Sequence, residues 1–227
     1  MHSKLIRAGI AAAAILGSPL TVRAADLGEP SYKAPAYFEP SFFTWSGLYI
    51  GINGGYGFGN SNWTDTTGAT TGDFGVTGGL VGGTIGFNLQ TGTWVWGLEG
   101  DIDASGIKGT DTATCGTPGC GTRNDWLATA RGRIGYGGFG NWLPFITGGA
   151  AFGDIKATTG AGSESTTKVG WTVGGGIEYA FLGSWSTKVE YLYADLGKAT
   201  CSSPTCFPDL DVKFHTSIVR LGLNYRF

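Results

Sequence analysis

The sequence is short of histidine, of excess positive charge and of long apolar runs. It has two histidines, one of them His2, and its 15 Lys and Arg do not outnumber its 17 Asp and Glu. Without a basic excess the chain is a poor candidate for binding nucleic acid. After the first 24 residues, no apolar run is long enough to cross a membrane as a helix. These shortages argue against a nucleic-acid partner and against a helical membrane protein.

The N-terminus carries the pattern of a secretory signal peptide. Lys4 and Arg7 precede an apolar run over residues 8–16, and residues 22–24 offer small side chains at cleavage positions. A membrane anchor would need a longer run. We expect residues 1–24 to be removed, which lowers the net charge to about −5. Residues 25–44 contain three prolines and no clean period, and are expected to form a periplasmic extension.

Glycine and aromatic residues are abundant: the chain has 42 glycines and 13% aromatics. Disordered glycine-rich chains are poor in aromatic residues. From Trp45 onward apolar and polar side chains alternate in eight segments, each long enough to cross a bilayer as a tilted strand. The segments are approximately residues 46–58, 74–89, 93–104, 125–136, 142–153, 169–181, 185–196 and 214–227.

The connections between these segments alternate in length. Short turns join the second segment to the third, the fourth to the fifth and the sixth to the seventh. The other connections, at about 59–73, 105–124, 154–168 and 197–213, are long and polar. Outer-membrane barrels are built this way. We therefore predict an all-β fold over residues 45–227, an eight-stranded antiparallel up-and-down transmembrane β-barrel with short periplasmic turns, long extracellular loops and periplasmic termini.

Charged residues share one parity of the strands, and large apolar residues share the other. In the third segment Trp96 and Leu98 alternate with Glu99 and Asp101. We expect the apolar parity to face lipid, because aromatic residues gather at both ends of the segments as two girdles. The set expected to line the lumen holds five acids and five bases: Glu99, Asp101, Asp103, Glu178, Glu190, Arg131, Arg133, Lys188, Arg220 and Arg226.

Two interpretations of this charged set stay open. It could line or gate a pore, or it could form an ion-pair network that fills the lumen. An eight-stranded barrel has room for little more than its own side chains, which favours the network. The face assignment predicts that Val219→Arg costs about 2–4 kcal/mol near the bilayer midplane. On the same basis, Arg220→Lys is expected to be mild.

The last segment, SIVRLGLNYRF at residues 217–227, is amphipathic and ends in an aromatic residue. It resembles the signal by which the outer-membrane assembly machinery selects its clients, with Leu221, Leu223, Tyr225 and Phe227 in the signal positions. Together with WSGLYIGINGGYGFG, the GGLVGGTIGFN–WVWGLEGDI hairpin, LATARGRIGY and the terminal GLNYRF, the chain resembles the small porin-like, immunogenic outer-membrane β-barrel family of alphaproteobacteria. The resemblance covers about residues 25–227, and the fold resembles the membrane domain of outer-membrane protein A. The porin-like label implies a narrow channel, although these motifs carry no chemistry.

The four cysteines form two pairs in predicted outer loops, Cys115-x4-Cys120 and Cys201-x4-Cys206. An exported protein meets oxidising conditions, so disulfides are expected, either within each pair or between the two loops. The spacing matches no common zinc pattern. We expect no metal and no cofactor.

The expected function is a structural and surface-exposed one, in which the barrel contributes to envelope integrity and its loops serve as an antigen or in adhesion. The first alternative is a narrow channel for ions or small solutes. The second is a lipid-modifying enzyme that uses His215, for which Glu164, Asp195 and Ser217 are possible companions in no recognisable triad. We expect no enzyme. The expected partners are outer-membrane lipids, lipopolysaccharide, the outer-membrane assembly machinery and surface ligands of the loops.

Overall fold

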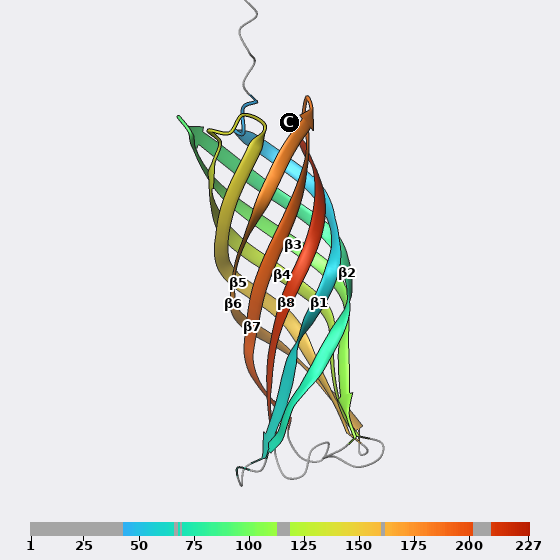
Figure 1. The fold of residues 1–227 in the computed structure, drawn as a ribbon. Helices are drawn as coiled ribbons and strands as arrows, with labels where there is room; N and C mark the ends of the chain where they lie inside the picture. Colours follow the sequence, from blue (N-terminus) through green and yellow to red (C-terminus); the bar gives the residue numbers. More distant parts are fainter. Residues whose placement is uncertain (1–42, 66–67, 69, 113–118, 160–161, 202–209) are drawn as a thin grey trace, which may run out of the picture. The chain divides into compact units, whose positions relative to one another are not determined.

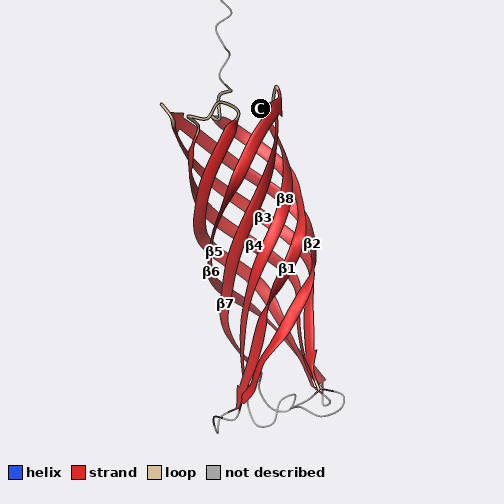
Figure 2. Cartoon of the chain, in the orientation of Figure 1, coloured by secondary structure: helices blue, strands red, loops and turns tan. Residues whose placement is uncertain are grey.

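The computed structural model describes residues 43–65, 68, 70–112, 119–159, 162–201 and 210–227, and these residues form eight strands (Figures 1 and 2). Within this part of the chain, no helix is long and apolar enough to cross a membrane. The strands are β1 (Gly47–Asp65), β2 (Thr70–Thr91), β3 (Trp94–Asp111), β4 (Cys120–Tyr136), β5 (Trp142–Thr159), β6 (Gly162–Leu182), β7 (Trp185–Cys201) and β8 (Leu210–Arg226).

The strands close into a single barrel in chain order. Each strand pairs antiparallel with the next, and β8 returns to pair with β1, with Tyr225 opposite Ile50 and Ser217 opposite Phe58. This closure leaves no sheet edge unpaired. A sheet that spans a membrane must close in this way, because unpaired backbone groups find no water in hydrocarbon. The predicted eight-stranded antiparallel barrel is confirmed.

The barrel has two unlike ends. At one end, which we call the turn end, residues 92–93, 137–141 and 183–184 connect the strands, and the C-terminus lies there too (Figure 1). Gly92, Gly140 and Gly183 have positive φ angles of 61°, 68° and 52°, which glycine adopts without a steric cost. At the other end, the loop end, residues 66–69, 112–119, 160–161 and 202–209 connect the strands.

The strands are longer than the sequence pattern predicted, and the outer connections are correspondingly shorter. Most of the residues expected in long loops, such as 105–111 and 154–159, continue as paired strand. An 18-residue strand tilted by about 40° rises roughly 45 Å along the barrel axis. The apolar band of an outer-membrane barrel is only about 25 Å tall. The loop end of the barrel therefore extends past the membrane as paired strands.

The outer wall of the barrel is apolar. Leu98 and Ile52 are 70% and 67% exposed, although a soluble protein would bury such side chains. Aromatic pairs mark both borders of this wall. Trp185 and Tyr225 lie 5.1 Å apart by ring centroid at the turn end, and Trp171 and Tyr193 lie 5.4 Å apart toward the loop end. An apolar band between two aromatic belts is the wall of a membrane barrel.

Candidate functional site

The inside of the barrel holds a layer of buried charged side chains. They come from β3, β4, β6, β7 and β8, whose period of two turns every second residue inward. We call this set the charged layer: Glu99, Asp101, Asp103, Arg131, Arg133, Glu178, Lys188, Glu190 and Arg220.

Two arginines hold the centre of the charged layer by contacting carboxylates on different strands. Arg131 on β4 donates to Glu190 on β7 at 2.6 Å, and to Asp101 on β3 at 2.7 Å. Arg220 on β8 donates through Nε to Glu190 at 2.8 Å and through its two terminal nitrogens to Asp101 at 3.0 and 3.1 Å. It also reaches Asp103 at 3.0 Å. Each guanidinium therefore ties together strands on different sides of the barrel.

A second group of contacts lies nearer the turn end. Arg133 donates to Glu178 at 2.8 Å, and its guanidinium stacks 4.2 Å from the ring centroid of Phe145. The Lys188 ammonium lies 2.7 Å from Glu99. Arg131 also donates to Glu99 at 2.5 Å, so this carboxylate joins the two groups of contacts into one network.

The charged layer has five acids but only four bases, and neutral donors add hydrogen bonds to three of its carboxylates, whereas Oδ1 of Asp103 has no partner among the described residues. The Tyr49 hydroxyl donates to Glu99 at 2.7 Å, and Thr129 donates to Asp101 at 2.7 Å. Glu178 accepts from Ser186 at 2.6 Å and from Asn224 at 3.0 Å. Buried carboxylates are tolerated when their lone pairs are satisfied in this way.

Arg226 does not belong to the charged layer, which corrects the balance of five acids and five bases. It is only half-buried at the turn end, where its guanidinium stacks 3.8 Å from the ring centroid of Phe43. Among the described residues it makes no ion pair. Arg226 has the inward parity, but a residue at the last position of a strand lies beyond the enclosed lumen.

The charged layer lies between two apolar layers. The inward residues of β3 show the order directly, because they run from Val95 through the three acids at 99, 101 and 103 to Ile107. Toward the turn end, Trp45, Val95, Leu143 and Ala180 form a buried cluster. Toward the loop end the interior is filled by a larger cluster: Trp63, Val76, Leu80, Ile107, Leu127, Ala151, Ile155, Ala157, Leu192, Ala194, Leu196, Val212, Phe214 and Ile218.

The loop-end cluster is the part of the interior that sequence reasoning missed. Trp63, Ile107, Ile155 and Val212 all fall in the predicted long loops. A signal was present, because Ile107 continues the inward parity of the acids on β3 and Ile155 continues that of Ala151 on β5. The composition of the polar residues between them predicts a loop, whereas they are the outward half of the same alternation.

Glycine makes room for the charged layer where strands approach closely. A Cβ atom added at Gly82 would lie 2.0 Å from Oδ1 of Asp103 and 2.2 Å from the backbone carbonyl of Ile102. At the adjacent Gly83, the nearest atom would be 3.8 Å away. The inward glycine is therefore needed for packing, and its outward neighbour is not.

His215 lies on the outward face of β8 near the aromatic belt of the loop end. Its ring centroid is 6.2 Å from that of Tyr193, and it faces Asp195 across the β7–β8 pair. Asp195 accepts from the backbone N–H of Gly197 at 2.8 Å, and Ser217 shares a hydrogen bond of 3.0 Å with Tyr191. Within the described residues, no hydrogen bond joins His215 to Asp195 or Ser217. Glu164 lies opposite Ala157 on β5, away from this group.

The cysteine pairs fall mainly outside the described part of the chain. Cys115 and Cys206 lie outside the described residues. Cys120 begins β4 and Cys201 ends β7. Their pairing as disulfides stays a prediction. No cluster of three or more His, Cys, Asp or Glu that could hold a metal occurs among the described residues.

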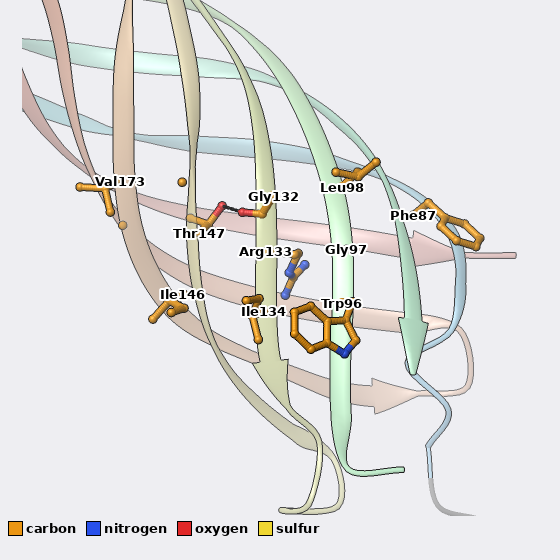
Figure 3. A pocket seen from close by; sticks show the side chains of 12 residues that line it. Phe87, Trp96, Gly97, Leu98, Gly132, Arg133, Ile134, Ile146, Thr147 and Val173 are labelled. Atoms are coloured by element: carbon orange, nitrogen blue, oxygen red, sulfur yellow. Dashed lines mark hydrogen bonds between the residues drawn. The ribbon is translucent and has the colours of Figure 1, made fainter. Parts of the chain in front are cut away.

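The outer wall also carries an apolar groove of about 750 Å³ (Figure 3). Trp96, Leu98, Ile146 and Val173 border it, and the outward glycines Gly132 on β4 and Gly148 on β5 leave its floor without side chains. One hydrogen bond crosses this floor, from Thr147 to the carbonyl of Gly132 at 2.9 Å. The groove lies within the apolar band and faces hydrocarbon.

The residues expected to form the assembly signal lie on the outward face of β8. Leu221, Leu223, Tyr225 and Phe227 are all exposed there. Phe227 packs against the Tyr225 ring, and its backbone N–H donates to the carbonyl of Leu48 at 3.0 Å. Their role in assembly stays a prediction.

A closed barrel with an apolar outer wall, two aromatic belts and a charged interior defines a bacterial outer-membrane protein. The chain belongs to the family of outer-membrane proteins with a β-barrel domain, whose family model matches residues 40–227. The protein is accordingly an outer-membrane protein, and the predicted family and location are confirmed.

Relatives of the chain include immunogenic proteins. It is 37% identical to the 31 kDa outer-membrane immunogenic protein of Brucella melitensis, over 90% of this chain and 92% of the relative. It is 31% identical to the 25 kDa outer-membrane immunogenic protein of Brucella abortus, over 96% of both chains. Among solved structures, the outer membrane protein OprG from Pseudomonas aeruginosa has a TM-score of 0.51 at 14% identity and covers 80% of this chain and 96% of its own, which shows the fold alone.

Proposed function

We propose that the protein is a non-conducting structural barrel, which reinforces the outer membrane and presents its strand ends and loops at the cell surface. The observation that carries the proposal is the sealed interior. Nine charged side chains form one ion-paired network, in which Oδ1 of Asp103 and Nε of Arg133 are the atoms without a hydrogen-bond partner among the described residues. Apolar layers cover this network toward both ends. Removing one charged partner from such a buried network lowers the free energy of unfolding by about 3–5 kcal/mol. A barrel held this rigidly suits a mechanical role.

The alternative of a narrow channel is disfavoured by the same packing. A passing ion would have to displace buried arginine and carboxylate groups that already hold each other at hydrogen-bond distance. It would also have to cross the apolar layers, where nothing replaces its hydration. The lumen of an eight-stranded barrel is too narrow to provide a water path beside these side chains.

A conductance measurement tests the sealed interior. The mature protein is refolded and inserted in a planar bilayer, beside Arg131→Ala and beside Leu221→Ala, a control on the lipid face. A band that shifts on heating in a gel shows that each protein is folded. We expect the wild type and the control to be silent. Reproducible discrete steps from the wild type, altered by Arg131→Ala and not by Leu221→Ala, would refute the proposal in favour of a channel.

The structural role has a separate test in cells. Cells that lack the protein should admit more of a hydrophobic dye through the outer membrane, and the wild-type gene should restore the barrier. Unchanged dye uptake in cells lacking the protein would contradict a role in envelope integrity.

The proposal includes no enzymatic activity. His215 has Tyr193 as its ring neighbour, while Asp195 and Ser217 form hydrogen bonds with other groups. His215→Ala should leave the lipid A composition of the cells unchanged by mass spectrometry. A lipid A species that depends on His215 would overturn this part of the proposal.

A further inference from the structure

Three basic residues stand side by side on the loop-end part of the outer wall. Lys108 on β3 is directly opposite Arg123 on β4, and Arg123 is directly opposite Lys156 on β5. Their neighbours along the strands, such as Ile107 and Ile155, are buried inside the barrel. The alternation of a strand therefore points the three basic side chains outward. We call them the basic row.

Repulsion between the charges of the basic row destabilises the barrel when no anion is bound. Side chains directly opposite one another in an antiparallel pair have Cβ atoms only about 5 Å apart, and like charges there are destabilising. Arg123, whose side chain is 58% exposed, forms an ion pair with Asp125. Lys108 and Lys156 make no ion pair within the described part of the chain. As far as the described residues go, the row thus has two positive charges without an ion pair, and an external anion would relieve the repulsion.

The height of the basic row matches the head-group level of a membrane. Arg123 lies three residues beyond Trp126, and Lys156 lies four residues beyond Phe152, in the direction of the loop end. With a rise of about 3.3 Å per residue and a tilt of about 40°, the row lies roughly 8–10 Å beyond these aromatic residues. Aromatic belts mark the edge of the hydrocarbon, so the row lies among polar head groups.

The surface at the basic row is hollowed. A depression of about 280 Å³ is lined by Lys108 and Arg123, by the exposed threonines at 110 and 158, and by glycines at 109, 119 and 121. Thr122 also borders it, but its hydroxyl bonds Ser61 and Trp63 inside the barrel. Gly121 leaves open space on the outer face beside Arg123, because a Cβ atom added there would have no neighbour nearer than 3.8 Å. Charged nitrogens with hydroxyl donors around an open space suit a phosphate group, because charge-assisted hydrogen bonds to its oxygens are strong.

We propose that the basic row binds the phosphate groups of a phosphorylated glycolipid of the outer leaflet, which in an outer membrane is lipopolysaccharide. The proposal rests on the orientation in the proposed function, with the loop end at the cell surface. Arg123 offers a planar donor pair, and the two lysines act as point charges on either side of it. Binding anchors the barrel to its lipid surroundings along β3 to β5.

The chain offers a matched control for the test. Lys198 on β7 and Lys213 on β8 also lie directly opposite each other on the outer wall, beside Asp211 at 3.9 Å from Lys198. Lys108→Gln/Lys156→Gln removes two charges from the basic row and keeps the ion pair of Arg123. Lys198→Gln/Lys213→Gln removes two charges elsewhere at the loop end. The two variants therefore have the same net charge.

The experiment measures binding of fluorescent lipopolysaccharide to the refolded full barrel in detergent, with a chelator present, and repeats it with dephosphorylated lipopolysaccharide. Each lysine near anionic head groups contributes a factor of about five to binding. We expect the basic-row variant to bind at least about tenfold more weakly than the wild type. We expect the control to bind within about threefold of the wild type, and the wild type to lose affinity for the dephosphorylated form.

Three results would overturn the proposal: equal losses in both variants, no loss in the basic-row variant, or equal binding of the phosphorylated and dephosphorylated forms. The heat-shifted gel band shows that both variants fold. The conductance of the wild type is measured separately, so a failure of the sealed-interior proposal and a failure of the lipid site are distinguishable.

Discussion

Val219 and Arg220 are adjacent on β8 and face opposite sides of the wall, so they give a sharp test of the architecture. Arg220 bridges Asp101, Asp103 and Glu190, and among the described residues it is the cation that pairs with Asp103, at 3.0 Å. Arg220→Met should reduce the free energy of unfolding by about 3–5 kcal/mol, because it leaves the buried Asp103 without a cation and leaves Asp101 and Glu190 with Arg131 alone of their two arginines. Arg220→Lys keeps one charge but cannot span three carboxylates. We now expect it to fall between the wild type and Arg220→Met, rather than to be mild as the parity alone suggested.

Val219 supplies the opposite perturbation. It lies six residues from Tyr225 in the turn-end aromatic belt, which places it roughly 15 Å into an apolar band of about 25 Å. Val219→Arg should therefore cost about 2–4 kcal/mol, and Val219→Met should cost less than about 1 kcal/mol.

Urea unfolding of the refolded barrel in lipid vesicles, followed by tryptophan fluorescence, measures both effects. The two methionine variants are the decisive pair, since they place the same side chain at neighbouring positions. A large loss for Arg220→Met with little loss for Val219→Met is the expected result. Equal unfolding midpoints for these two variants would refute the assignment of faces. A harmless Arg220→Met would refute the desolvated network, because only a hydrated lumen tolerates unpaired carboxylates.

Three further predictions concern single positions. Gly82→Ala should destabilise the barrel by about 1–3 kcal/mol, because its methyl group would overlap the neighbouring strand, whereas Gly83→Ala should be nearly neutral in the same urea assay. Similar losses at both glycines would contradict the packing. Arg226→Ala should cost about 1 kcal/mol or less by urea unfolding, because it removes a stacking contact with Phe43 and no buried ion pair; a loss as large as that of Arg220→Met would place it in the network after all. Phe227→Ala should lower the amount of barrel assembled in cells, measured in outer-membrane fractions, and leave refolding in vesicles unchanged; a matching loss in both assays would make Phe227 a stability residue.

Much of the fold could be predicted because side chains of a membrane strand face lipid and lumen in turn, with a period of two residues. The alternation of Trp96 and Leu98 with Glu99 and Asp101 indicates which side chains share a face of the strand. The length of the connections then gives the orientation of the strands. This reasoning needs only local order along the chain, and the closed barrel with short turns at one end agrees with it.

The contacts across the lumen could not be predicted in the same way. Parity says that Arg131 points inward, but its partner Glu190 lies 59 residues away on the far side of the barrel. Which inward residues meet depends on the stagger of all eight strands, and a single segment does not contain that information. The same limit explains why Arg226 was wrongly expected in the charged layer, because parity does not tell how far along the barrel axis a residue lies.

The ends of the strands were also misplaced, for a different reason. Threonine, serine and glycine dominate the loop-end segments, and such residues are usual in turns. Here they form the outward face of strands that are already beyond hydrocarbon, where a polar outward side chain is favourable. The apolar inward partners, such as Ile107 and Ile155, are what keep these segments in the sheet.

The continuation of the strands past the membrane determines what an antibody or a phage would meet at the cell surface. Much of the projecting part is a pleated surface whose neighbouring side chains come from different strands. An epitope on this surface is assembled only when the barrel closes. A synthetic peptide that copies one strand lacks the side chains that the neighbouring strands contribute to such an epitope. A vaccine antigen based on this surface should therefore be the folded barrel and not a peptide.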